Sequence, residues 1–136
     1  MAELLRQFKS GVMKVDEPTM RMMSEMGYTV RFRKDHPEII AEEIQYKLIM
    51  PPWVYIACIE NFVLHFDVRD RLHDIQQPTL VHTGDRDALV KWTYSEFLAK
   101  HIPHAKLVVV PKQNHGTIRE VPETVVGELD TMVGLK

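Results

Sequence analysis

The chain has little of what marks a disulfide-stabilised, nucleic-acid-binding or membrane-spanning protein. Its one cysteine, Cys58, excludes an intrachain disulfide and a metal site built from cysteines. Its Lys and Arg residues are scattered and the net charge is -2, so there is no basic stripe for a phosphate backbone and we expect no nucleic-acid partner. The apolar runs are shorter than the roughly 18 residues that cross a bilayer. The N-terminal MAELLRQFKS has no apolar signal core, so we expect a cytoplasmic protein without a membrane span.

The composition is that of one ordinary globular domain. The 136 residues are 45% hydrophobic, which suffices for a modest core. Cys58, in WVYIACIENF, is expected to be a small core residue rather than a reactive thiol. Methionine is concentrated in MRMMSEM, where we expect flexible core filling, with an adaptable apolar binding surface as the alternative.

Residues 1–70 are predicted to be a helical region. Apolar spacing and proline positions indicate helices in AELLRQFK, in DEPTMRMMSEMG and in HPEIIAEEIQYKLIM. The segment that follows, PPWVYIACIENFVLHFDVRDRL, is predicted to contain a buried helix. Its apolar positions are Val54, Ile56, Ala57, Ile59, Phe62 and Val63.

Residues 71–136 change to alternating strands and helices. TLVHTG and KLVVVP are short β-branched runs, and they predict parallel strands at Thr79–Thr83 and Lys106–Val110 that helices cover on both faces. A helix is expected over Lys91–His101 and another from Pro122, with an apolar stripe along each. Two successive βα units indicate an α/β fold.

The order of motifs in this second half resembles the C-terminal third of an α/β-hydrolase. The segments DIQQPTLVHTGDRDALV and IPHAKLVVVPKQNHGTIREVPETV carry the resemblance. They contain a strand, Gly84 and Asp87, a helix, a second strand, His115 and an E-x-P-E motif. The similarity is close over residues 67–133 and looser over residues 1–66, which correspond to the helical cap inserted before the last two strands. It implies a helical cap-like half followed by two parallel βα units of a hydrolase core.

Asp87 and His115 are the candidate catalytic residues. Ligands of open α/β sheets bind beyond the carboxyl ends of the strands, and each of the two residues follows a predicted strand. A carboxylate that accepts the Nδ1 proton of His115 leaves Nε2 free to act as a base and stabilises the imidazolium formed in the reaction. The G-x-x-D pattern of the family selects Asp87, whereas Asp85 is expected to hydrogen-bond backbone within its own turn. The alternative is that Asp87 is only a turn former and His115 only a loop residue.

The nucleophile of such a triad has no counterpart in the sequence. The family carries it in a G-x-S-x-G elbow or an Asp equivalent, earlier in the chain than the acid and the histidine. None of the six glycines pairs with another to bracket a Ser, Asp or Cys in this way. The resemblance therefore implies hydrolysis of an ester, lactone, epoxide or similar small apolar substrate, without a cofactor, by a chain that is inactive alone. The competing hypothesis is a non-catalytic binding or assembly protein that keeps the fold.

The other histidines show no recognised metal-ligand spacing. His101 and His104 flank a proline, and His65 and His73 lie near aspartates without a known pattern, so we predict surface positions and no metal site. His82, inside a predicted strand, is expected to be a hydrogen-bonded core residue. The alternative is that His82 faces the substrate pocket.

The strand count predicts self-association. A two-stranded parallel sheet is not expected to be stable alone, and the outer edge of Thr79–Thr83 would be open and apolar. We therefore expect a homodimer or higher oligomer with Thr79–Thr83 at or near the interface, or a complementary N-terminal fragment that supplies further strands. The alternative is a monomer in which the cap helices cover the edge.

Overall fold

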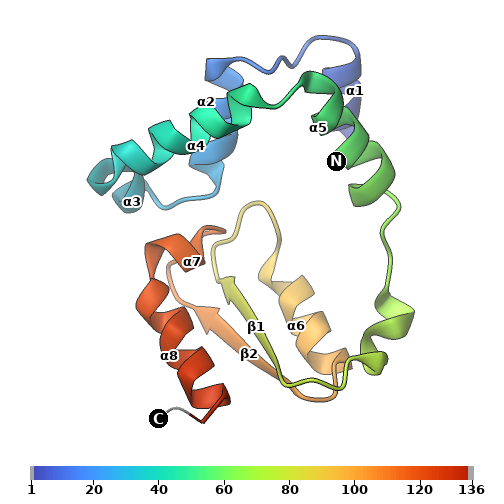
Figure 1. Cartoon of the computed structure of the whole chain (residues 1–136), viewed down its shortest axis with the longest axis vertical. Coiled ribbons are helices and arrows are strands. Elements are labelled where there is room, and N and C mark those ends of the chain that lie inside the picture. Colours follow the sequence, from blue (N-terminus) through green and yellow to red (C-terminus); the bar gives the residue numbers. More distant parts are fainter. Residues whose placement is uncertain (1, 135–136) are drawn as a thin grey trace. The chain divides into compact units, whose positions relative to one another are not determined.

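The structure, a computed structural model that describes residues 2–134, divides into two compact units (Figure 1). The first comprises the described residues up to Glu25 together with Arg33–Asp67. The second comprises Met26–Phe32 together with the described residues from Val68 on. Residues 26–32 thus group with the strands, although they come from the region predicted to be a cap. The assignment of residues 1–70 as a cap stays a prediction.

The first unit is helical. Its helices are α1 (Ala2–Lys9), α2 (Glu17–Met26), α4 (Pro37–Ile49) and α5 (Pro52–Cys58), and the short α3 (Val30–Asp35) links the two units. The buried apolar side chains of this unit are Phe8, Met20, Ile40, Ile44 and Ile59. Met20 is fully buried but Met22 is 47% exposed, so the methionine segment fills the core with only part of its side chains. None of the helices among the described residues is both long enough and apolar enough to cross a membrane.

The segment after Pro51 is not the single buried helix that was predicted. α5 ends at Cys58, a π-helical turn (η1, Ile59–Val63) follows, and a 3₁₀ helix (η2) spans Arg69–Asp74. Cys58 is exposed and Phe62 is 54% exposed, so the prediction that both lie in the core is wrong. A π-helical turn has more residues per turn than an α-helix, so Phe62, which continues the α-helical stripe of α5, no longer points to the core.

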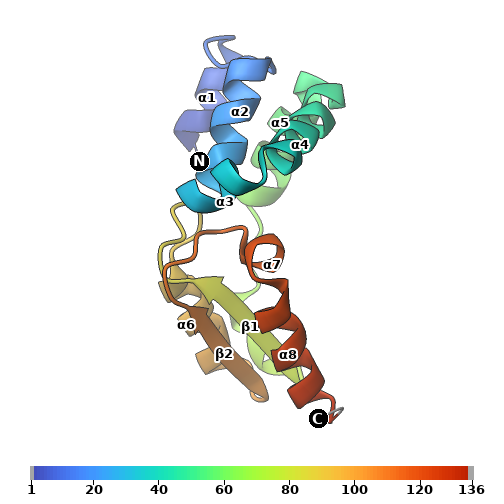
Figure 2. The ribbon, with the colours of Figure 1, turned by 90° about the vertical axis from the view of Figure 1, so that its left-hand side faces the viewer.

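The second unit is built on two parallel strands, β1 (Thr79–Gly84) and β2 (Ala105–Val110). Figure 2 shows α6 (Trp92–His101) and α8 (Pro122–Met132) on opposite sides of this sheet. α6 joins the strands as a crossover helix and packs on both of them, while α8 contacts β1. The predicted α/β class is confirmed, and the short α7 (Thr117–Glu120) before α8 was not predicted.

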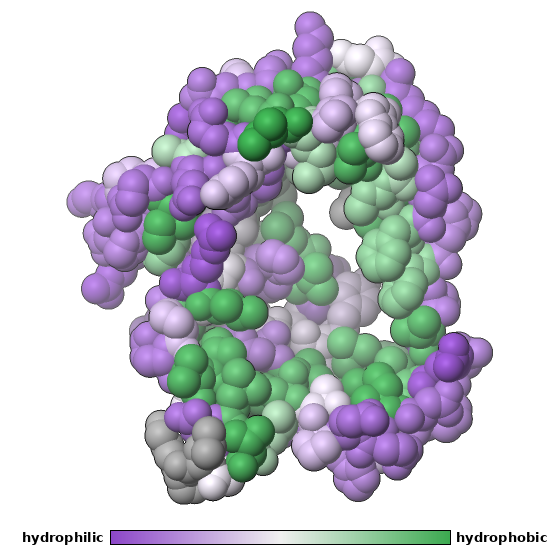
Figure 3. All heavy atoms as spheres, in the orientation of Figure 1, coloured by the Kyte–Doolittle hydropathy of each residue, from purple (hydrophilic) through white to green (hydrophobic). Residues whose placement is uncertain are grey.

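The helices of the second unit are only partly covered. Tyr94 on α6 is 62% exposed, and Val126 on α8 is 53% exposed. Figure 3 shows apolar side chains at the surface around α8. β2 is also less covered than predicted, because Val110 is the one residue of the strand that is buried. A sheet of two strands is too narrow to cover the whole apolar stripe of a helix on each face.

Candidate active site

The loops that follow β1 and β2 meet directly beyond the strands. The parallel register places Gly84 opposite Val110, so both strands end at the same edge of the sheet. A Cβ atom on Gly84 would lie 2.3 Å from the backbone oxygen of Gln113, so only glycine allows the loops this close. The backbone N–H of Arg86 donates to that same oxygen at 2.9 Å. The close approach brings the residues that follow each strand within reach of one another.

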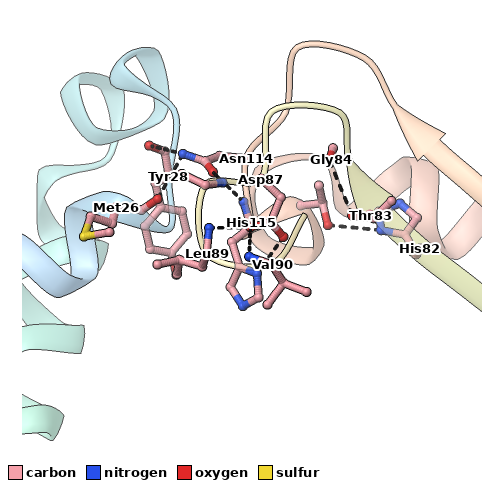
Figure 4. A network of polar contacts seen from close by, with 12 residues as sticks. Met26, Tyr28, His82, Thr83, Gly84, Asp87, Leu89, Val90, Asn114 and His115 are labelled. Atoms are coloured by element: carbon pink, nitrogen blue, oxygen red, sulfur yellow. Dashed lines mark hydrogen bonds and ion pairs between the residues drawn. The ribbon is translucent and has the colours of Figure 1, made fainter. Parts of the chain in front are cut away.

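Asp87 and His115 form a hydrogen-bonded pair at this place (Figure 4). Oδ2 of Asp87 lies 2.8 Å from Nδ1 of His115. The other carboxylate oxygen, Oδ1, accepts the backbone N–H groups of Leu89 at 2.9 Å and Val90 at 2.8 Å. The side chain of Asp87 is 5% exposed and that of His115 is 49% exposed. The carboxylate is therefore fixed and buried, while the imidazole is open to a reactant.

This geometry determines the tautomer of His115. An ionised carboxylate only accepts hydrogen bonds, so Nδ1 of His115 is the donor to Asp87. The neutral ring then carries its free lone pair on Nε2, the atom that can take a proton from a reacting group. Asp87 and His115 lie together, as an orienting acid and a general base would. Their catalytic roles stay predictions.

Asp85 does not behave as expected. It is exposed, and its carboxylate makes no hydrogen bond to another residue in the described part of the chain. Asp87 closes the turn instead, because its Oδ1 lies within reach of the N–H groups two and three residues further on. Asp85 contributes through its backbone, with its N–H donating to the carbonyl of Val110 at 3.1 Å.

Residues 26–29 support the loop after β2, and the sequence did not indicate this contact. The N–H of Gly116 donates to the carbonyl of Gly27 at 2.7 Å, and a Cβ atom on Gly116 would lie 2.4 Å from the ring of Tyr28. Glu120, the first residue of the E-x-P-E motif, accepts the N–H of Thr29 at 2.8 Å and its hydroxyl at 2.6 Å. The motif was visible in the sequence, but nothing linked it to a turn so much earlier in the chain.

His82 is half-buried in β1, not fully in the core as predicted, and only one of its ring nitrogens has a hydrogen-bond partner among the residues that the structure describes. Its Nδ1 lies 3.0 Å from the hydroxyl of Thr117, whereas its Nε2 is buried and has no partner within residues 2–134. Burial lowers the pKa of His82, and the charge of Glu128 opposes this shift. The prediction of a hydrogen-bonded histidine therefore holds for one of the two ring nitrogens.

No metal site is built from the residues that the structure describes. They contain no group of three His, Cys, Asp or Glu side chains able to hold a metal ion. The histidines predicted to lie at the surface are exposed: His65, His73, His101 and His104.

Several known proteins with a similar sequence or structure are hydrolases. No family model matches the chain. It is 32% identical to the putative carbamate hydrolase RutD of Caulobacter vibrioides over 91 residues, which are 67% of this chain and 34% of that protein. A solved hydrolase from Pseudomonas aeruginosa PA01 has a TM-score of 0.82 at 19% identity, over 98% of this chain and 50% of that one. A thermophilic esterase from Thermogutta terrifontis has a TM-score of 0.71 at 28% identity, over 84% of this chain and 42% of that one.

The extent of these matches shows which part of the fold is present. The chain spans about a third of its curated relative and about half of the solved structures. The match to the Pseudomonas aeruginosa hydrolase covers 98% of this chain and therefore includes its two strand–helix units and the loops that hold Asp87 and His115. The chain therefore has the α/β-hydrolase fold, of which it represents the C-terminal portion.

Proposed function

We propose that this chain is a cytoplasmic protein that carries the acid and the base of an α/β-hydrolase catalytic triad, Asp87 and His115. The observation that carries the proposal is the 2.8 Å bond from Nδ1 of His115 to a carboxylate whose other oxygen is held by two backbone N–H groups. The reaction would be nucleophilic hydrolysis of an ester, lactone, epoxide or similar small apolar substrate. The names of the carbamate hydrolase and esterase that resemble the chain support this class of reaction.

In this mechanism His115 moves the proton and Asp87 stabilises the charge that results. With a serine nucleophile, Nε2 of His115 takes the hydroxyl proton as the oxygen attacks the carbonyl carbon, and it later gives the proton to the leaving group. The imidazolium between these steps is stabilised by Asp87, whose buried carboxylate lies next to Nδ1. The exposed side of the imidazole is the side a nucleophile can reach.

The nucleophile has to come from outside these residues. The sequence has no glycine pair that could form the strained elbow on which α/β-hydrolases hold it. We therefore expect the chain alone to hydrolyse activated esters no faster than free imidazole does.

An esterase assay with short p-nitrophenyl esters tests this proposal. The chain is measured alone, mixed with the part of the Pseudomonas aeruginosa hydrolase that it does not match, and fused to that part. We expect background rates alone, and a rate in the fusion that His115→Ala abolishes and His104→Ala leaves unchanged. Turnover by the chain alone that depends on one of its own serines contradicts the missing nucleophile. A folded fusion that is inactive contradicts the assignment of the pair.

We also propose that a second polypeptide completes the sheet. β1 pairs with β2 and with no other strand among the described residues, so one edge of β1 keeps unpaired N–H and C=O groups. The apolar side chains exposed on α6 and α8 lie in the same unit. A homodimer through Thr79–Thr83 satisfies the edge with the fewest components, and a complementary hydrolase segment is the alternative. These surfaces equally favour the second candidate function, a non-catalytic binding or assembly role.

A further inference from the structure

The side-chain amide of Asn114 bridges three separate segments of the second unit (Figure 4). Its Oδ1 accepts the backbone N–H of Ala88 at 3.1 Å and that of His115 at 3.0 Å. Its Nδ2 donates to the backbone carbonyl of Met26 at 3.0 Å and to that of Tyr28 at 3.5 Å. One side chain thus contacts the loop after β1, the loop after β2 and the turn at residues 26–28.

The amide has no hydrogen-bonding capacity left over. A primary amide offers two lone pairs on oxygen and two N–H donors, and all four are used here. Aspartate has the same shape but cannot donate, and serine or alanine cannot span the segments. The position therefore requires a group that accepts on one side and donates on the other.

The two accepted N–H groups belong to residues that control the Asp87–His115 pair. Ala88 directly follows Asp87, and the second N–H is that of His115 itself. A single side-chain oxygen atom consequently links the two loops next to the 2.8 Å bond, in addition to the backbone contact between Arg86 and Gln113. The carbonyl contacts on the other side of the amide hold this oxygen in place.

We propose that Asn114 is a positioning residue: its amide holds Asp87 and His115 at hydrogen-bonding distance and thereby maintains the Nδ1-protonated tautomer of His115. This role of Asn114 rests on the proposed function, because it assumes that the pair is catalytic. The effect on the tautomer does not depend on that assumption. It can be measured on the chain alone, without activity.

The test measures the ¹⁵N chemical shifts of the His115 ring in the folded protein. The native chain is expected to show one tautomer, with a proton on Nδ1 that is protected from exchange. In Asn114→Ala the two tautomers should mix, so that the shifts approach those of the same histidine in urea and the protected proton is lost. Gln113→Ala, in the same loop, should leave the spectrum unchanged, because the side-chain oxygen of Gln113 has no partner among the residues described.

Asn114→Asp separates the two sides of the amide. It keeps an oxygen towards Ala88 and His115 but loses both donors, so we expect the Nδ1 proton to persist. This variant also provides a result if Asn114→Ala does not fold. If Asn114→Asp loses the Nδ1-protonated tautomer of His115 as completely as Asn114→Ala does, the role given to Oδ1 of Asn114 is wrong.

Two further outcomes distinguish this inference from the proposed function. If Asn114→Ala is less stable but keeps the native ring shifts, Asn114 is structural only and the inference fails. If the shifts change as expected while the complemented enzyme is inactive even with Asn114 intact, the proposed function fails and the inference stands. In an active fusion, Asn114→Ala should lower kcat by about 10²-fold with KM nearly unchanged, as a small misplacement of catalytic groups does.

Discussion

In the second unit, two polar side chains in the loops that follow β1 and β2 have their hydrogen bonds made, whereas the apolar side chains of α6 and α8 are only partly buried. At the loops the carboxylate of Asp87 takes part in three hydrogen bonds, and every donor and acceptor of the Asn114 amide is used. Beside the strands, Tyr94 and Val126 are more than half exposed. The polar side chains of Asp87 and Asn114 are satisfied within the unit, whereas the apolar side chains of its helices stay partly exposed.

This difference between the loops and the helices arises because hydrogen bonds need only a local contact, whereas burial of a helix needs a broad surface. Two strands in register suffice to bring two loops together, and hydrogen bonds over a few ångströms then organise the side chains. Burial of two helices needs a wider sheet than two strands provide. A chain with this part of the fold can thus hold the hydrogen-bonded pair of Asp87 and His115 in place while its helices stay partly exposed.

The largest effect is expected from Asp87→Asn in a complemented enzyme. Asparagine can donate to Nδ1 and so favours the wrong tautomer of His115, and it cannot stabilise the imidazolium, so the rate should fall by about 10⁴-fold. Asp85→Asn is the matched control and should change the rate little, because its carboxylate is exposed. Ester hydrolysis by the two variants measures the difference, and equal losses refute the choice of Asp87.

Gly84→Ala should separate the loops and cost stability. The added methyl group would lie 2.3 Å from a backbone oxygen that cannot move without shifting the loop after β2. We expect a loss of about 3 kcal/mol in urea unfolding, at the upper end for overpacking. Gly127→Ala, in α8 with nothing within 4 Å of its Cβ, should instead gain about 0.5–1 kcal/mol. If Gly84→Ala leaves the free energy of unfolding unchanged, the two loops are not in close contact at Gly84.

Leu80→Lys tests the open edge of β1. If a symmetry mate pairs with Thr79–Thr83, the native chain should have the mass of a dimer at micromolar concentration. Leu80→Lys should reduce this mass to that of a monomer, because the lysine places a charge beside the interface. Val109→Lys on β2, where the native side chain is 36% exposed, should keep the dimer. Size-exclusion chromatography with light scattering decides, and a clean monomer that unfolds cooperatively rules out the homodimer.

The smallest effect concerns His82 and pH. Burial lowers its pKa in the folded state below the ordinary value of 6.5, so the unfolded chain binds the proton more readily. The free energy of unfolding should fall as the pH drops through 6.5 and level off below the folded pKa. His82→Gln should flatten this dependence in urea titrations between pH 7.5 and 5, while His104→Gln, at an exposed site, should not. An unchanged slope in His82→Gln excludes His82 as its source.

Local sequence signals predicted the strands and the candidate pair well. TLVHTG and KLVVVP became β1 and β2 because short β-branched runs favour a buried strand. Asp87 and His115 came together because parallel strands end at the same edge, so the positions after each strand indicate the contact. Exposure of Phe62 was not predictable in this way, because a single π-helical turn redirects the side chains after α5.

The sequence by itself determined the α/β class, the two strands and the order of Gly84, Asp87 and His115, since each depends on residues close together in the chain. Only the tertiary structure decided that Asp85 is exposed while the carboxylate of Asp87 is buried, and that Asn114 joins both loops to a turn near Tyr28. Those outcomes depend on contacts between distant segments, which appear only when backbone groups approach within hydrogen-bonding distance.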